Sequence, residues 1–304
     1  MKLRIVIYIL LGVVFAALVT VGIWFLVKPK AIETQPEDQT EDQSEDESEV
    51  SGAKKLIFIH HSTGENWLMD DNGGLGEALM GASYFVSDTN YGWGPDSIGD
   101  LTDIGHWSNW FRGEDSQPYL EALYEESGQN SEYSRLTTVP AGENEIIMFK
   151  SCFPNSNLGG DSDDPIPSID NNPLVGQDSG SQYHTIANAK GIYVDLLNYF
   201  ETEPDKLFVV VTAPPLGRNN TTSTNAANAR ALNNWIKSDW LDNYPYENVV
   251  VFDLYDILTN NGASNYSLYS TGFSDDHPYQ EGNQLATYEF IPFLDSAYAD
   301  WKGD

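Results

Sequence analysis

The sequence predicts a three-layer α/β/α sandwich with a mostly parallel, five-stranded sheet between residues 53 and 304. Five short apolar segments in this region are separated by longer stretches, several of which have helical periodicity. Three of the five are nearly continuous runs of β-branched or aromatic residues, which is typical of strands covered on both faces. Strands that alternate with helices indicate βαβ units, whose strands run parallel.

The five predicted strands are short. They cover residues 55–60, 83–87, 145–150, 207–212 and 248–253. Long segments rich in Gly, Asn, Asp and Pro follow the second and third strands, at 88–110 and 155–183. Loops of this length in a compact domain are usually functional, and open α/β sheets place their sites beyond the carboxyl ends of the strands. We therefore expect the site at that edge of the sheet.

Three segments are predicted to be helical. The first carries apolar residues at steps of three and four, which places them on one helix face. These residues are Ile186, Ala189, Tyr193, Leu197 and Phe200. A second helix is predicted over 224–240. The last should cover about 283–301, with a kink near Pro292.

A transmembrane anchor is predicted over residues 1–32. Residues 5–27 contain no charge, and at ~1.5 Å per helical residue they would extend roughly 35 Å, enough to cross a membrane. A cleavable signal peptide has a shorter apolar region, but cleavage stays open. Basic residues flank both ends of the run, so the positive-inside comparison is nearly tied. The free amino terminus and the acidic remainder favour a cytoplasmic N-terminus, a single pass through the cell membrane and an extracytoplasmic domain.

Residues 33–52 are predicted to be an acidic, disordered linker. Nine acidic and no basic residues lie between 33 and 50, and such a segment buries too little apolar surface to offset its ordering entropy. From residue 51 onward, 37 acidic and 11 basic residues leave a net charge of about −26. This charge repels nucleic acids and anionic lipids. A nucleic-acid partner is therefore excluded.

The sequence gives no reason to expect a metal or a cofactor. Cys152 is the only cysteine, which rules out an intrachain disulfide and a cysteine-based metal site. His60 and His61 end the first predicted strand, where adjacent side chains point to opposite faces. The acidic loop at 160–164 lacks the spacing of a calcium-binding EF-hand.

Two short segments contain residue types used in nucleophilic catalysis. Ser62 follows the first predicted strand directly, where backbone N–H groups can bind an oxyanion, although a serine there is more often a helix N-cap. His277 lies in the sequence SDDHPYQEG at 274–282, ahead of the last predicted helix. A nucleophilic serine needs a base within hydrogen-bonding reach and a carboxylate that orients the base. The second segment supplies both residue types.

Taken together, these segments resemble the SGNH (GDSL-type) hydrolase superfamily, of which the chain looks like a divergent member. Residues 59–62 (IHHS) are similar to the first conserved block of that family, and 277–282 (HPYQEG) to its last. Residues 90–96 (NYGWGPD) resemble the second block, while 207–216 and 249–255 are similar to the fourth and fifth strands. The resemblance covers about residues 53–300 and implies a flavodoxin-like sheet.

The resemblance also implies a mechanism of acyl transfer without a cofactor. Ser62 would attack an ester carbonyl while His277 accepts its proton, and Asp275 would orient His277. The N–H groups of Ser62 and Gly94 and the amide of Asn155 would stabilise the oxyanion. Each such donor contributes roughly 3 kcal/mol in comparable sites.

The sequence departs from the family pattern in three places. Histidines at 60–61 replace the Gly-Asp that precedes the nucleophile in the family. The family's Asn motif after the third strand is not intact, and Asn155 is its nearest counterpart. The third position before the histidine holds serine instead of aspartate. Asp275 or Asp276 could take over its role, with Asp275 favoured; if neither does, a Ser–His dyad remains.

We therefore predict a serine esterase that hydrolyses short acyl esters such as acetyl esters. A carbohydrate ester is a reasonable substrate, because several tryptophans near the site loops could stack on sugars. They are Trp67, Trp93, Trp107 and Trp110. Two alternatives stay open: an acyltransferase on the same fold, and a non-catalytic extracytoplasmic glycan-binding domain.

Overall fold

A computed structural model describes residues 52–128 and 133–303. The predicted anchor at 1–32 and the acidic linker up to residue 51 lie outside the described residues, so both stay predictions. Within the described residues, no helix combines the length and the apolar character needed to cross a membrane.

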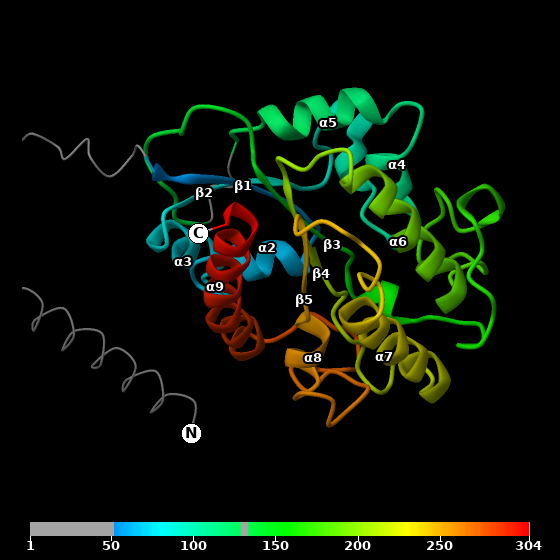
Figure 1. Cartoon of the computed structure of the whole chain (residues 1–304). Coiled ribbons are helices and arrows are strands. Elements are labelled where there is room, and N and C mark those ends of the chain that lie inside the picture. Colours follow the sequence, from blue (N-terminus) through cyan, green and yellow to red (C-terminus); the bar gives the residue numbers. More distant parts are fainter. Residues whose placement is uncertain (1–51, 129–132, 304) are drawn as a thin grey trace, which may run out of the picture. The chain divides into compact units, whose positions relative to one another are not determined.

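Five parallel strands form one sheet in the order β2-β1-β3-β4-β5 (Figure 1). They are β1 (Lys54–Ile59), β2 (Tyr84–Thr89), β3 (Ile146–Lys150), β4 (Leu207–Val211) and β5 (Val249–Phe252). Each lies within two residues of a predicted strand. This is the 2-1-3-4-5 strand order of flavodoxin-like folds, so the predicted fold class is confirmed.

Helices cover both faces of the sheet (Figure 1). One layer consists of α4 (Trp107–Phe111), α5 (Ser116–Glu125), α6 (Ile186–Phe200) and α7 (Ser223–Ser238). The other consists of α2 (Thr63–Leu68), α3 (Leu75–Gly81) and α9 (Gln280–Lys302). Alternate side chains of β1 point to opposite faces. Ile57 and Ile59 therefore pack in one core, and Leu56 and Phe58 in the other.

The three predicted helices correspond to α6, α7 and α9, and Pro292 lies inside α9. The hydroxyls of Thr185 and Thr222 cap the N-termini of α6 and α7. Each accepts one backbone N–H of the first helical turn, which would otherwise have no partner within the helix. The sequence did not predict the shorter helices, which include α8 (Leu254–Leu258) after β5. Short 3₁₀ turns cover Pro95–Asp100, Ile104–His106, Phe153–Ser156 and Ile169–Asn171.

The last helix packs against the first helix of the domain. The buried indole of Trp67 on α2 donates a hydrogen bond of 2.9 Å to the Thr287 hydroxyl on α9. That hydroxyl donates in turn to the Gly73 carbonyl at 2.7 Å. Because α2 begins directly after Ser62 and α9 begins three residues after His277, these contacts bring the two predicted site segments to one region of the domain.

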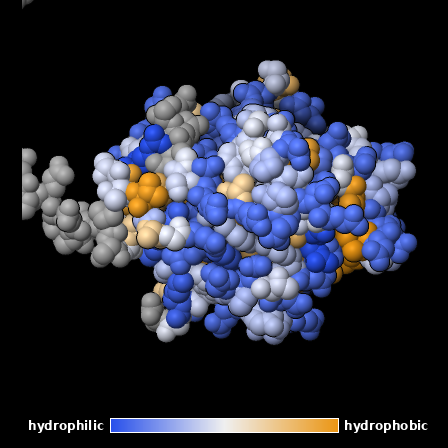
Figure 2. Space-filling view, turned by 90° about the horizontal axis from the view of Figure 1, so that it is seen from above, coloured by the Kyte–Doolittle hydropathy of each residue, from blue (hydrophilic) through white to orange (hydrophobic). Residues whose placement is uncertain are grey.

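The surface seen in Figure 2 is mostly hydrophilic, with a few separate apolar patches. This distribution agrees with the excess of acidic over basic residues in the sequence. A broad, contiguous apolar patch is the usual mark of a protein or membrane interaction surface. The face in Figure 2 does not present one.

Candidate functional site

The carboxyl ends of β1 and β3 bring Ser62 and Cys152 together. The two strands pair in parallel with Ile59 opposite Phe149, so the residues that follow them leave the sheet at the same edge. The Ser62 hydroxyl lies 3.4 Å from the Cys152 sulfur. The Thr63 hydroxyl lies 3.5 Å from the same sulfur. Ser62 is partly exposed and can be reached from solvent.

Lys150, the last residue of β3, buries its ammonium group beside this pair. The residue is 1% exposed. Its Nζ donates hydrogen bonds to the Thr63 hydroxyl and, at 3.4 Å, to the Ser151 carbonyl. Burial lowers the pKa of Lys150, while the nearby Cys152 thiolate favours the charged form of the lysine. A buried ammonium next to a thiol favours a thiolate–ammonium pair.

Lys150 in turn changes the acidity of Cys152. Burial alone would raise the pKa of this thiol. The charge of Lys150 and the hydrogen bonds from Ser62 and Thr63 outweigh burial, so the pKa of Cys152 is lowered from 9.0. Neither Lys150 nor Cys152 was predicted from the sequence to take part in the site. Their positions at the end of the third predicted strand, level with Ser62, were the signal that could have found them.

We expect Cys152 to be alkylated by iodoacetamide with a pH midpoint below 9.0, because the thiolate is the reacting species. Lys150→Met should raise this midpoint, since burial then acts on the thiol without an opposing charge. The midpoint is obtained by measuring the alkylated fraction at each pH by mass spectrometry. No other cysteine contributes to the signal, because the chain has one cysteine. Lys190→Met on α6 is the matched control. Equal midpoints in the Lys150 variant and the wild type would contradict the assigned role of Lys150.

His277 is held by Asp275 in the loop before α9. The Asp275 carboxylate accepts the His277 backbone N–H at 3.0 Å and contacts the ring Nδ1. These bonds lower the pKa of Asp275, so the carboxylate is ionised and Nδ1 must carry the proton. The other ring nitrogen, Nε2, makes no hydrogen bond with the described residues and is left as the basic atom. The histidine side chain is 27% exposed.

The ring of His277 also packs edge-on against Phe153, with the ring centroids 5.0 Å apart. Phe153 follows Cys152, whose sulfur contacts Ser62. The structure therefore brings Ser62 and His277 to the same edge of the sheet. No hydrogen bond joins these two described side chains directly.

Asp276 has a different environment from Asp275. It is buried, and its carboxylate accepts the Gly217 N–H at 2.7 Å and the Asn220 amide at 2.8 Å. It therefore ties the loop of His277 to the segment after β4. Of the two carboxylates considered from the sequence, Asp275 is the one that contacts His277.

No hydrogen bond within the described residues joins Ser62 to Gly94 or Asn155, the two residues expected to complete the oxyanion site. The Asn155 amide donates to an Asp103 carboxylate oxygen at 2.5 Å and to the Cys152 carbonyl at 3.3 Å. Both of its N–H groups are thus used inside the protein, and Asn155 is 1% exposed. Gly94 lies on an exposed turn with φ of 77°. Nothing described connects it to Ser62.

The two histidines before Ser62 make separate contacts, and the buried Nδ1 of His60 has no hydrogen-bond partner among the described residues. His60 Nε2 lies 3.2 Å from an Asp88 carboxylate oxygen. His61 Nε2 lies 2.5 Å from the Gly99 carbonyl, and its Nδ1 lies 2.9 Å from the Thr102 hydroxyl. In the described part of the chain, no cluster of three or more His, Cys, Asp or Glu side chains could hold a metal ion.

Tyr91 also lies at this edge of the sheet and was not among the site residues predicted from the sequence. Its ring stacks on His61, with centroids 3.8 Å apart and planes 22° from parallel. Its hydroxyl interacts with the Ser62 side chain. The signal was the pairing of neighbouring strands: β1 and β2 end with Ile59 opposite Thr89, so the residue two positions after Thr89 lies beside the one two positions after Ile59.

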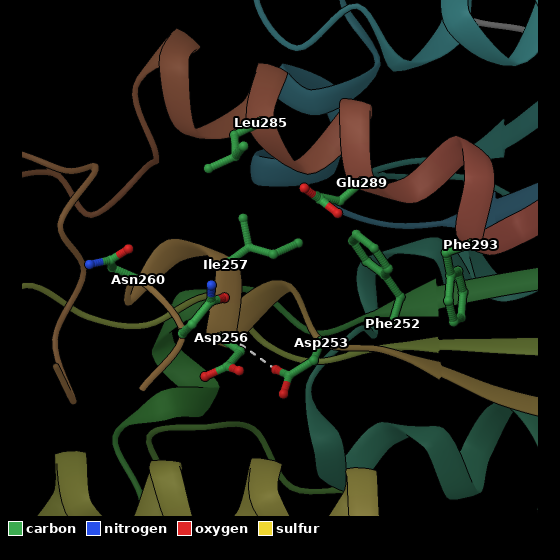
Figure 3. A pocket seen from close by; sticks show the side chains of 9 residues that line it. Phe252, Asp253, Asp256, Ile257, Asn260, Leu285, Glu289 and Phe293 are labelled. Atoms are coloured by element: carbon green, nitrogen blue, oxygen red, sulfur yellow. Dashed lines mark hydrogen bonds between the residues drawn. The ribbon is translucent and has the colours of Figure 1, made fainter. Parts of the chain in front are cut away.

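A pocket of about 380 Å³ lies elsewhere, where β5 is followed by α8 (Figure 3). Asp256 and Ile257 of α8 face Leu285 and Glu289 of α9 across it. Its lining includes none of the residues placed around Ser62. Asp256 already pairs with Arg230 at 2.6 Å. The lining contains no Ser, Thr, Cys, Lys or His side chain.

Known proteins of similar structure are distant in sequence. No protein-family model matches the chain, and no curated protein is significantly similar. A family two carbohydrate esterase from Cellvibrio japonicus is 13% identical with a TM-score of 0.40, over 83% of this chain and 63% of that chain. This chain thus spans less than two thirds of the esterase. A second solved chain is 14% identical with a TM-score of 0.37, over 80% of this chain and 97% of its own.

Proposed function

We propose that this protein is a serine esterase that hydrolyses short acyl esters such as acetyl esters, with a carbohydrate ester as one candidate substrate. Trp67, Trp107 and Trp110, which were expected to offer surfaces for stacking on sugars, are buried in the core and cannot do so. One observation carries the proposal: the partly exposed Ser62 and a His277–Asp275 pair lie at the same carboxyl edge of the parallel sheet. His277 has its Nε2 free and its Nδ1 proton directed at an ionised carboxylate. This is the orientation that a general base needs.

In the proposed reaction, His277 Nε2 takes the proton of the Ser62 hydroxyl as Oγ attacks the ester carbonyl. The tetrahedral oxyanion forms near the backbone N–H of Ser62, which makes no hydrogen bond to the described residues. Its collapse expels the alcohol, which takes the proton from His277, and leaves an acyl-serine. Water then attacks with His277 again as the base, releasing the acid and restoring Ser62. Asp275 stabilises the imidazolium during both steps.

Ser62 and His277 must approach each other for this reaction. In the structure the Ser62 hydroxyl contacts the Cys152 sulfur instead. Catalytic hydrogen bonds are often long or misaligned without substrate and shorten in the substrate complex. Rotation of the Ser62 side chain away from Cys152 is the movement that the mechanism requires.

The same contact with Cys152 favours a second candidate function, a non-catalytic glycan-binding domain on this fold. A fluorophosphonate separates the two, because it forms a stable adduct only with a serine that a base activates. Full-length protein should gain one adduct, located at Ser62 by peptide mass spectrometry, and lose p-nitrophenyl acetate hydrolysis in proportion. Absence of both labelling and hydrolysis would favour the binding domain.

We further propose that residues 1–32 anchor the domain to the cell membrane with the esterase site outside. The support is the uncharged run at 5–27 and the strongly acidic remainder of the chain. The acidic linker at 33–52 would then separate the domain from the membrane.

A further inference from the structure

The ring of Tyr91 is held in place by its neighbour His61. Burial lowers the pKa of His61, so its ring is neutral, with one N–H donor and one acceptor. Nε2–H donates to the Gly99 carbonyl, and Nδ1 accepts the Thr102 hydroxyl. With both ring nitrogens bonded, His61 presents a fixed flat surface. Tyr91 stacks on that surface.

The Tyr91 hydroxyl is both near the reaction and open to substrate. It interacts with the Ser62 side chain, and the residue is 63% exposed. Burial of the hydroxyl and the neighbouring Cys152 outweigh the Ser62 hydroxyl, which acts in the opposite direction, and raise the pKa of Tyr91 above its ordinary value of 10.0. The phenol therefore keeps its proton at neutral pH. It is available as a hydrogen-bond donor.

The site also lacks a side-chain donor where the sequence suggested one. Both N–H groups of the Asn155 amide are bonded to Asp103 and to the Cys152 carbonyl. If the Asn155 amide donated to an oxyanion instead, the Asp103 carboxylate and the Cys152 carbonyl would lose their hydrogen bonds. Leaving buried acceptors without a hydrogen bond costs free energy. A donor that is not already engaged inside the protein serves this purpose better.

We propose that the Tyr91 hydroxyl is a catalytic group that donates a hydrogen bond to the oxyanion formed when Ser62 attacks an ester. The inference rests on the proposed esterase function and adds a residue to its site. The proton stays on the phenol throughout, so no bond to Tyr91 is made or broken. The interaction strengthens as negative charge develops on the carbonyl oxygen. It therefore acts on the transition state more than on bound substrate.

Tyr91→Phe tests this role while keeping the ring and its stacking on His61. We expect kcat for p-nitrophenyl acetate to fall about 10²–10³-fold, the usual loss for one oxyanion donor, with little change in KM. Inhibition by a boronic acid, which forms a tetrahedral adduct with a serine, should weaken by a similar factor. Tyr288→Phe is the matched control, because Tyr288 is 76% exposed on α9. It should behave as wild type.

A second substrate distinguishes the oxyanion from the leaving alcohol as the acceptor. Loss of an oxyanion donor should slow ethyl acetate and p-nitrophenyl acetate by similar factors. A much larger loss with ethyl acetate would place the Tyr91 proton on the leaving oxygen and overturn the assignment.

The remaining outcomes separate this inference from the proposed function. Wild-type kcat in Tyr91→Phe, with turnover that still requires Ser62, would overturn the role of Tyr91 and leave the esterase intact. Absence of any Ser62-dependent turnover in the wild type would overturn both.

Discussion

Replacing Ser62 by alanine is expected to lower kcat for p-nitrophenyl acetate about 10⁶-fold, the size of loss seen when a serine hydrolase loses its nucleophile. Without the hydroxyl no acyl-enzyme can form, and only direct attack by water remains. KM should change little, because the Ser62 side chain adds little to ground-state binding. The measurement is steady-state hydrolysis by the full-length chain, with the slow residual rate followed over hours.

Ser274→Ala is the matched control for this experiment. Ser274 is an exposed serine three residues before His277, and its hydroxyl makes no hydrogen bond within the described chain. Its loss should leave kcat unchanged. If Ser62→Ala retained more than a few per cent of the activity, Ser62 could not be the nucleophile. The neighbouring Cys152 would then have to be tested by Cys152→Ser.

Asp275→Asn should lower kcat about 10⁴-fold, as expected when the carboxylate behind a catalytic histidine becomes an amide. The ionised Asp275 fixes the proton on His277 Nδ1. An asparagine amide can instead donate to Nδ1, which moves the ring proton to Nε2 and removes the basic atom from the reaction. It also leaves the imidazolium without a counter-charge. Steady-state kinetics at neutral pH measure the loss.

Asp276→Asn is the corresponding control, because its effect should be on stability. The Asp276 carboxylate accepts two N–H donors, from Gly217 and Asn220. An asparagine can accept only one of them and turns its own NH₂ group toward the other. We expect a loss of about 1–3 kcal/mol in the free energy of unfolding, measured with urea. A larger fall in kcat for Asp276→Asn than for Asp275→Asn would reverse the two assignments.

The fold was predictable because its signals lie within short segments. Each strand is a run of apolar residues buried on both faces, and 207–211 (LFVVV) shows this most clearly, since all five residues are buried. The long helices have several turns of apolar periodicity. Helices of five to ten residues, such as α4 and α5, show too few periods to be distinguished from loops. Their stability comes from packing on the sheet.

The contacts of the site were predictable only between residues that are close together in the sequence. Asp275 and His277 are two residues apart, so their contact could be anticipated. The neighbours of Ser62 come from other strands: Tyr91 follows β2, and Cys152 follows β3. The flavodoxin-like strand order places these strand ends side by side, but the register that brings Tyr91 and Cys152 level with Ser62 is visible only in the structure. The internal bonds of the Asn155 amide depend on Asp103, a residue of another loop, and could not be anticipated either.

The docking of α9 on α2 has a consequence for the maturation of the protein. Ser62 precedes the first helix, while His277 precedes the last, and the bond from Trp67 to Thr287 fastens these helices together. A growing polypeptide that has reached only β5 therefore holds its nucleophile without its base. The proposed esterase remains latent during biosynthesis, and its activity reports that the final segment has folded into place.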